Sequence, residues 1–104
     1  MPEPVVTSTL QIDTENGLHI RPAEALARLA NRFESRIEIV YESQRVDAKS
    51  IMEMLTLGAC QGATLQIEAS GADARQAIDA IQALAEHKFE LAKEPTPAPN
   101  STPL

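Results

Sequence analysis

The sequence has few aromatic residues, a single cysteine and no long apolar run. Phe33, Tyr41 and Phe89 are its only aromatic residues, so a folded core must be built mainly from aliphatic side chains. With Cys60 alone, no disulfide can form within the chain, which favours a reducing compartment. No apolar segment approaches the roughly 20 residues that a membrane-spanning helix needs. These features predict a soluble cytoplasmic protein.

Positive charge is also scarce. Lys and Arg number 9 against 15 Asp and Glu, which leaves a formal net charge of −6 at pH 7. This charge argues against nucleic acid or an anionic membrane surface as the main partner, and it is compatible with docking onto other soluble proteins. The N-terminus lacks a basic stretch followed by an apolar one, so we expect no signal peptide. At 104 residues, the chain has the length of one domain with one modest core.

The spacing of apolar residues predicts seven secondary-structure elements. Alternation of apolar and polar residues predicts strands with one wet face at 6–12, 37–41, 45–46 and 64–69. Helical spacing predicts helices at 23–34, 51–57 and 70–91. Each strand has one apolar face, and the three amphipathic helices must bury theirs. We therefore predict an α+β fold in which a four-stranded antiparallel sheet carries all three helices on one face.

The first candidate site lies in the stretch 16–23, which joins the first strand to the first helix. Pro22 fits a helix only in its first turn, so His19 falls at or just before the helix N-terminus, where an anion is favoured. Neutral imidazole is nucleophilic near pH 7, which makes His19 a candidate phosphoryl acceptor with Arg21 stabilising the phosphate. The simpler alternative is that His19 only caps backbone amides or lies in solvent, and that Arg21 is a surface charge.

The second candidate site is Ser50. The segment Ser50–Glu53 matches a capping box, in which a hydroxyl and a carboxylate satisfy N–H groups at a helix start. A phosphate on the same hydroxyl would be tolerated there and would alter the docking of partners. A short helix cannot bury apolar residues around its whole circumference, so we expect part of this set to remain exposed for a partner: Ile51, Met52, Met54, Leu55 and Leu57.

Other kinds of site are not supported. His19, Cys60 and His87 lack the spacing of zinc ligands, and the sequence has no glycine-rich nucleotide loop, so we expect neither a metal nor another cofactor. Cys60 is interpreted as a small, half-buried apolar residue, and His87 as a side chain near the end of the last helix. The Pro-rich segment 93–104 is predicted to be disordered, which leaves 1–92 as the folded domain.

Two motifs at a defined separation resemble the HPr family, the histidine-containing phosphocarrier proteins of the bacterial phosphoenolpyruvate-dependent sugar phosphotransferase system. Gly17–Ala23 resembles the active-site motif of that family. Ala48–Met52, followed by Leu57–Gly58, resembles its regulatory-serine segment. Gly62, the strand after it and the final helix complete the likeness over about residues 5–91. The resemblance implies an open-faced β-sandwich, in agreement with the predicted order of elements.

The resemblance also implies a mechanism. Phosphorylated enzyme I would transfer its phosphoryl group to Nδ1 of His19, Arg21 would steady it, and an enzyme IIA-type acceptor would remove it. The protein would then be a carrier with a covalent intermediate, not an enzyme that releases a product. An HPr kinase/phosphorylase would act on Ser50.

The resemblance further implies a partner surface on the first two helices, made of Ile20, Glu24, Arg28, Lys49, Ile51, Met52 and Leu55. We expect a monomer that binds neither nucleic acid nor membranes. The alternative function is a regulatory HPr-like binding module that is controlled by phosphorylation of Ser50 and has no role in sugar uptake.

Overall fold

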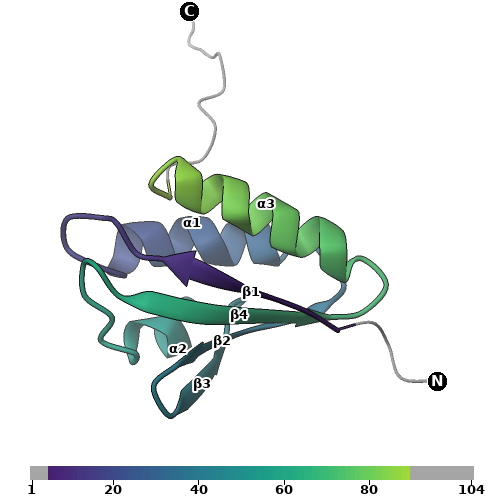
Figure 1. The fold of residues 1–104 in the computed structure, drawn as a ribbon, viewed down its shortest axis with the longest axis horizontal. Helices are drawn as coiled ribbons and strands as arrows, with labels where there is room; N and C mark the ends of the chain where they lie inside the picture. Colours follow the sequence, from purple (N-terminus) through teal and green to yellow (C-terminus); the bar gives the residue numbers. More distant parts are fainter. Residues whose placement is uncertain (1–4, 90–104) are drawn as a thin grey trace, which may run out of the picture.

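The computed structural model describes residues 5–89, which form a four-stranded antiparallel sheet with three helices (Figure 1). The elements are β1 (Val5–Gln11), α1 (Ile20–Ala30), β2 (Arg36–Tyr41), β3 (Gln44–Asp47), α2 (Ile51–Leu55), β4 (Thr64–Ser70) and α3 (Ala74–Glu86). The predicted α+β class and the order of elements are confirmed. In the sheet the strands lie in the order β1-β4-β2-β3, so the first and last strands of the chain are neighbours.

The period-two patterns divide the sheet into an apolar and a polar face. Leu10 pairs with Leu65 between β1 and β4, and Ile39 pairs with Ile67 between β2 and β4. All four side chains are buried in the core, over which α1 and α3 lie in Figure 1, while α2 packs against α1 and β3. Among the described residues, Phe89 is the one aromatic side chain buried in this core, which is otherwise aliphatic as predicted.

The polar face carries an ion-pair cluster. Glu38 and Glu68 stand directly opposite each other on β2 and β4, an arrangement that would be destabilising because the two charges repel. The guanidinium of Arg45 on β3 lies between them, with Nη1 2.9 Å from Glu38 Oε1 and 2.7 Å from Glu68 Oε1. One cation therefore compensates two carboxylates.

Both long helices end earlier than predicted. α1 ends at Ala30, and Phe33 lies in the following turn, because the Asn31 side chain donates to the Ala27 carbonyl oxygen (2.8 Å) and to the Lys49 carbonyl oxygen (3.2 Å). α1 begins at Ile20, directly after His19 and with Pro22 in its first turn, as the position of Pro22 predicts, although the apolar periodicity starts only at Ala23.

α2 stops at Leu55 and α3 at Glu86, short of the predicted ends at 57 and 91. None of the helices within residues 5–89 is long and apolar enough to cross a bilayer. The tail predicted for 93–104 lies outside the described residues.

Candidate functional site

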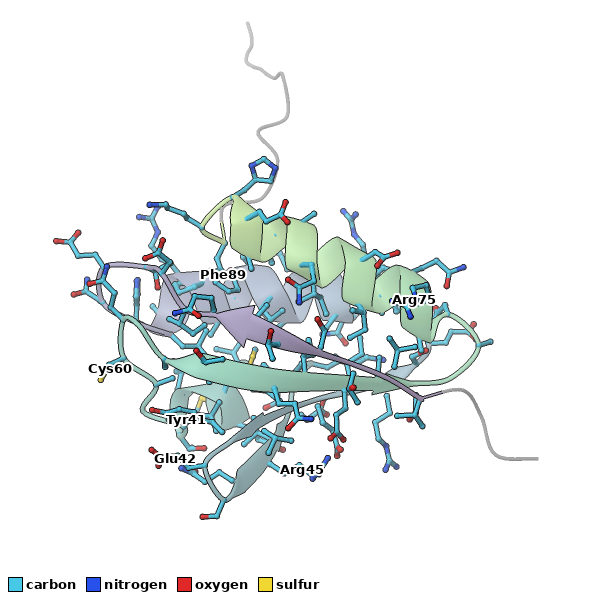
Figure 2. All side chains as sticks on the ribbon, in the orientation of Figure 1. Tyr41, Glu42, Arg45, Cys60, Arg75 and Phe89 are labelled. Atoms are coloured by element: carbon cyan, nitrogen blue, oxygen red, sulfur yellow. The ribbon has the colours of Figure 1, made fainter. Side chains whose placement is uncertain are left out.

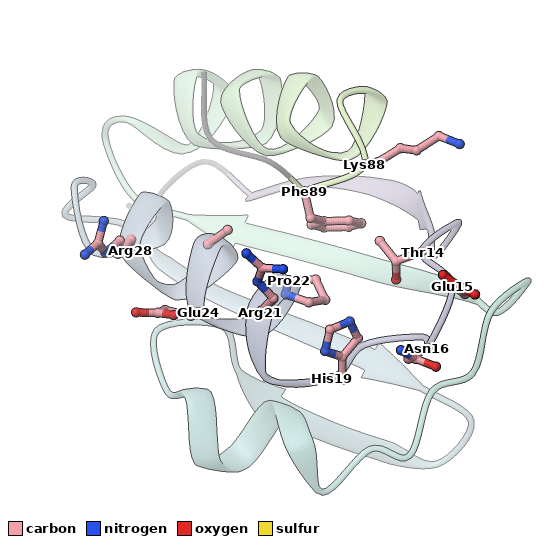
Figure 3. A pocket seen from close by; sticks show the side chains of 11 residues that line it. Thr14, Glu15, Asn16, His19, Arg21, Pro22, Glu24, Arg28, Lys88 and Phe89 are labelled. Atoms are coloured by element: carbon pink, nitrogen blue, oxygen red, sulfur yellow. The ribbon is translucent and has the colours of Figure 1, made fainter. Parts of the chain in front are cut away.

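An open cavity of about 740 Å³ lies where three segments meet (Figure 3). The β1–α1 loop contributes residues 14–16, α1 and its N-cap contribute side chains from His19 to Arg28, and the residues after α3 contribute Lys88 and Phe89. His19 and Arg21 both line this cavity, so the structure brings the two predicted site residues together.

His19 is the N-cap residue of α1. Its carbonyl oxygen accepts the Ala23 N–H at 3.0 Å, but its imidazole makes no capping hydrogen bond, so the interpretation of His19 as a side-chain cap is wrong. Within the described residues, no carbonyl accepts the N–H of Ile20 or Arg21, as expected for the first turn of a helix. The ring and these N–H groups are therefore available to an anion.

The loop before His19 is held by close contact with the α2–β4 connection. Leu18 N–H donates to the Ala59 carbonyl oxygen at 2.9 Å, and the Thr14 hydroxyl donates to the Gly17 carbonyl oxygen at 2.5 Å. Gly17 has a φ of 70°, and a Cβ at this position would collide with the Ala59 carbonyl oxygen and the backbone of Cys60. Glycine is thus required here for both conformation and space.

Five lining residues were not predicted as part of a site, namely Thr14, Glu15, Ala25, Lys88 and Phe89. The Phe89 ring comes from beyond α3 and is 4% exposed. The sequence did contain a signal for it. Leu84 and Phe89 are both apolar and lie five positions apart, which is the spacing of the apolar pair that accompanies a Schellman helix end. No glycine marked that end, which obscured the signal.

Ser50 caps α2 as predicted, but the expected capping box is only half formed. The Ser50 hydroxyl accepts the Glu53 N–H at 3.2 Å. The Glu53 carboxylate accepts the Asp47 N–H at 2.9 Å instead of the Ser50 N–H, which donates to the Asp47 carbonyl oxygen at 3.1 Å. The difference arises because β3 ends three residues before the cap and brings the Asp47 N–H within reach.

The comparison with known families agrees with this geometry. Residues 6–87 match the sequence model of the family described as "PTS HPr component phosphorylation site". The chain belongs to the HPr family. HPr proteins are phosphocarriers of the phosphotransferase system, and this assignment supports the carrier function rather than the alternative of a purely regulatory binding module.

Individual HPr relatives are similar over nearly their whole length. Phosphocarrier protein HPr of Treponema pallidum (strain Nichols) is 37% identical over 86 residues, which cover 83% of this chain and 98% of the relative. The crystal structure of HPr-C-His from Thermoanaerobacter tengcongensis has 39% identity and a TM-score of 0.78, and the match covers 83% of this chain and 99% of that one. The described residues thus have the open-faced sandwich of HPr proteins.

A longer protein also contains a similar segment. The phosphoryl donor subunit DhaM of the PEP-dependent dihydroxyacetone kinase of Providencia stuartii (strain MRSN 2154) is 37% identical over 87 residues. The match covers 84% of this chain and 18% of that protein. A segment similar to this chain is therefore also part of a larger phosphoryl donor.

The residues predicted to contact partners in this HPr chain fall into two groups. Ile20, Met52 and Leu55 are exposed apolar side chains on α1 and α2, which confirms that part of the short helix remains uncovered; Met54 and Leu57 are buried. Glu24 and Arg28 are exposed and line the cavity.

Two of the predicted partner residues are held by the fold itself. Ile51 is half-buried against the core. Lys49 is half-buried, and its ammonium donates to the Phe33 carbonyl oxygen at 2.7 Å, which ties the start of α2 to the chain just after α1.

The two remaining candidates for chemistry lie elsewhere. Cys60 is exposed and points away from the sheet in Figure 2, so its interpretation as a half-buried residue is wrong. The physical reason is that Ala59, not Cys60, packs into the core beside Gly17. His87 is the C-cap of α3 and does not line the His19 cavity. Within residues 5–89, no three His, Cys, Asp or Glu side chains are grouped so that they could hold a metal ion.

Proposed function

We propose that His19 carries the phosphoryl group as a covalent phosphohistidine. The imidazole Nδ1 attacks the phosphorus of phosphorylated enzyme I, the bond from phosphorus to the donor breaks, and its electron pair returns to the donor. An enzyme IIA-type acceptor then takes the group from His19 in the same way. The observation that carries this proposal is the His19 ring itself, which stands at the N-terminus of α1 without a capping bond and opens on a cavity that it shares with Arg21.

The surroundings of His19 suit a group that must be both accepted and released. Arg21 lies beside His19 in Figure 3, and its guanidinium stabilises the added negative charge together with the N-terminus of α1. Glu15 and Glu24 line the same cavity and reduce its positive potential. Moderate stabilisation of the phosphoryl dianion allows the acceptor to remove it.

The test of this proposal uses the two histidines of the chain. After incubation with phosphoenolpyruvate and a cognate enzyme I, the protein should carry one acid-labile phosphate. His19→Ala should remove the label, and His87→Ala should keep it, because His87 caps α3 away from the cavity. Unchanged labelling of His19→Ala would sink the assignment.

Partners are proposed to dock across the N-terminus of α1 and the exposed side of α2. Ile20 is 59% exposed and Met52 is 75% exposed, and their helices pack against each other. The carrier is proposed to act as a monomer.

A second role is proposed for Ser50, as the substrate of an HPr kinase/phosphorylase. Ser50 caps the helix that carries Met52, so a phosphate there would place negative charge beside the proposed docking surface. Within the described residues, the Ser50 hydroxyl makes one hydrogen bond, in which it accepts the Glu53 N–H at 3.2 Å. Incubation with ATP and the kinase should add one phosphoryl mass to the wild type and none to Ser50→Ala; no gain in the wild type contradicts this role.

A further inference from the structure

The end of α3 contains unusual backbone conformations. Within residues 5–89, three non-glycine residues have positive φ, namely Glu42 (56°), Lys88 (56°) and Phe89 (64°). Two of the three are consecutive and directly follow α3. L-residues are crowded in this region of conformational space, and such strain persists only where the surrounding structure holds it, frequently at functional sites.

The strained turn brings the Phe89 side chain back onto the molecule. Lys88 N–H donates to the Ala85 carbonyl oxygen at 2.9 Å, and Phe89 N–H donates to the Leu84 carbonyl oxygen at 2.8 Å. This is the hydrogen-bond pattern of a Schellman motif, in which Lys88 takes the position usually occupied by glycine. The outcome is that the Phe89 ring is buried and forms one wall of the His19 cavity.

Phe89 lines the same cavity as residues on either side of His19, namely the β1–α1 loop and the first turn of α1. In Figure 3 the side chains of Phe89, Pro22 and Thr14 all border this cavity. Pro22 is buried and belongs to the first turn of α1, so it cannot shift without moving that turn. The first turn also contains the N–H groups of Ile20 and Arg21 that we assign to the phosphoryl group.

We propose that Phe89 is a positioning residue for phosphoryl transfer. It does not touch the phosphoryl group; it supports Pro22 and thereby fixes the orientation of the His19 ring relative to the N-terminus of α1. This inference rests on the proposed role of His19. Loss of the ring leaves a space beside Pro22 into which the first turn can move, and small displacements of reacting groups reduce transfer steeply.

The first experiment needs no phosphorylation. The ¹⁵N chemical shifts of the His19 imidazole are measured in unphosphorylated wild type, Phe89→Ala and Ile81→Ala. Ile81 is a fully buried residue of α3, the helix that precedes Phe89, and it does not line the cavity, so its truncation also leaves a space in the core. The His19 signals should move in Phe89→Ala and stay in place in Ile81→Ala. Equal behaviour of the two variants contradicts positioning.

The second experiment measures transfer from phosphorylated enzyme I and the lifetime of the phosphorylated protein. Phe89→Ala should lower the transfer rate by about ten- to a hundredfold and shorten that lifetime. Phe89→Leu keeps much of the apolar volume and should lose less than about fivefold, whereas Ile81→Ala should stay within about twofold.

The outcomes separate this inference from the function it rests on. If Phe89→Ala does not fold, Phe89→Leu is compared with Ile81→Val, and only the Phe89 variant should slow transfer. Normal transfer by both Phe89 variants overturns the positioning role while His19 remains the acceptor. An unlabelled wild type, by contrast, overturns the proposed function, and the His19 chemical shifts still decide whether Phe89 orients the ring.

Discussion

At the scale of single residues, the position of His19 depends on how closely two stretches of backbone approach. The Leu18 N–H bond to Ala59 joins the loop before α1 to the connection before β4. That contact is possible because Gly17 has no Cβ. The backbone before His19, the proposed phosphoryl acceptor, is therefore held by a segment more than 40 residues away in the sequence.

Replacement of Gly17 by Ala should lower the free energy of unfolding by about 2 kcal/mol or more, because the new Cβ meets the Ala59 carbonyl oxygen in addition to the cost of positive φ. Gly58 is the matched control, since its φ of 66° is nearly the same as the 70° of Gly17 and a Cβ there meets nothing within 4 Å. Gly58→Ala should cost only about 1 kcal/mol. Urea unfolding measures both, and equal losses would refute the close approach.

At the scale of elements, a single carboxylate joins α3 to the turn before β2. Asp73 Oδ2 accepts the Glu34 N–H at 2.9 Å, and Asp73 Oδ1 accepts the Ser35 N–H at 2.9 Å. The Ser35 hydroxyl also donates to Oδ1. These bonds hold the pKa of Asp73 below its ordinary value of 3.8. The largest contribution comes from the Ser35 hydroxyl and the next from the Glu34 N–H.

The lowered pKa of Asp73 makes the free energy of unfolding depend on pH. The pKa of Asp73 is lower in the folded than in the unfolded state. Its contribution to the free energy of unfolding is therefore fully present above pH 3.8 and is lost as the pH falls through the pKa of the folded state. The difference in free energy of unfolding between wild type and Asp73→Asn should be largest near neutral pH and shrink under acid conditions. Urea titrations across that range provide the measurement, and a difference that does not vary with pH is incompatible with the linkage.

The sequence patterns predicted the elements well and their ends poorly. Alternation identified the inward residues Ile39 and Ile67, and the N-terminal preference of Pro22 located the start of α1. The end of α3 was not predicted, because Lys88 occupies a position where glycine is expected. The hydrogen-bond partner of the Glu53 carboxylate was not predicted, because it depends on how β3 is placed against α2, which no local pattern encodes.

At the scale of the whole molecule, the proposed function requires a surface on which donors and acceptors can reach His19. Exposed large apolar side chains occur at Ile20, Met52 and Leu55 on two helices in contact, and separately at Val5 on β1. The first three belong to the proposed docking surface. Val5 lies on β1, which packs against α3, and provides a comparison within the same chain.

Met52→Asp should slow transfer from enzyme I about five- to tenfold, because a charge is placed in an apolar contact. Its free energy of unfolding should change by no more than about 0.5 kcal/mol, since the side chain is 75% exposed. Val5→Asp, at a site 62% exposed, should leave the rate unchanged. Equal slowing of both variants would place the docking surface elsewhere.

The central claim, that His19 is the covalent phosphoryl acceptor, is tested most directly by mass spectrometry of the wild-type protein. The protein is incubated with phosphoenolpyruvate and a cognate enzyme I and kept out of acid, because phosphohistidine is acid-labile. The account predicts a gain of one phosphoryl group per chain, and peptide fragmentation should locate it on His19. A phosphoryl group on any other residue, or no gain in mass with an active enzyme I, would contradict it.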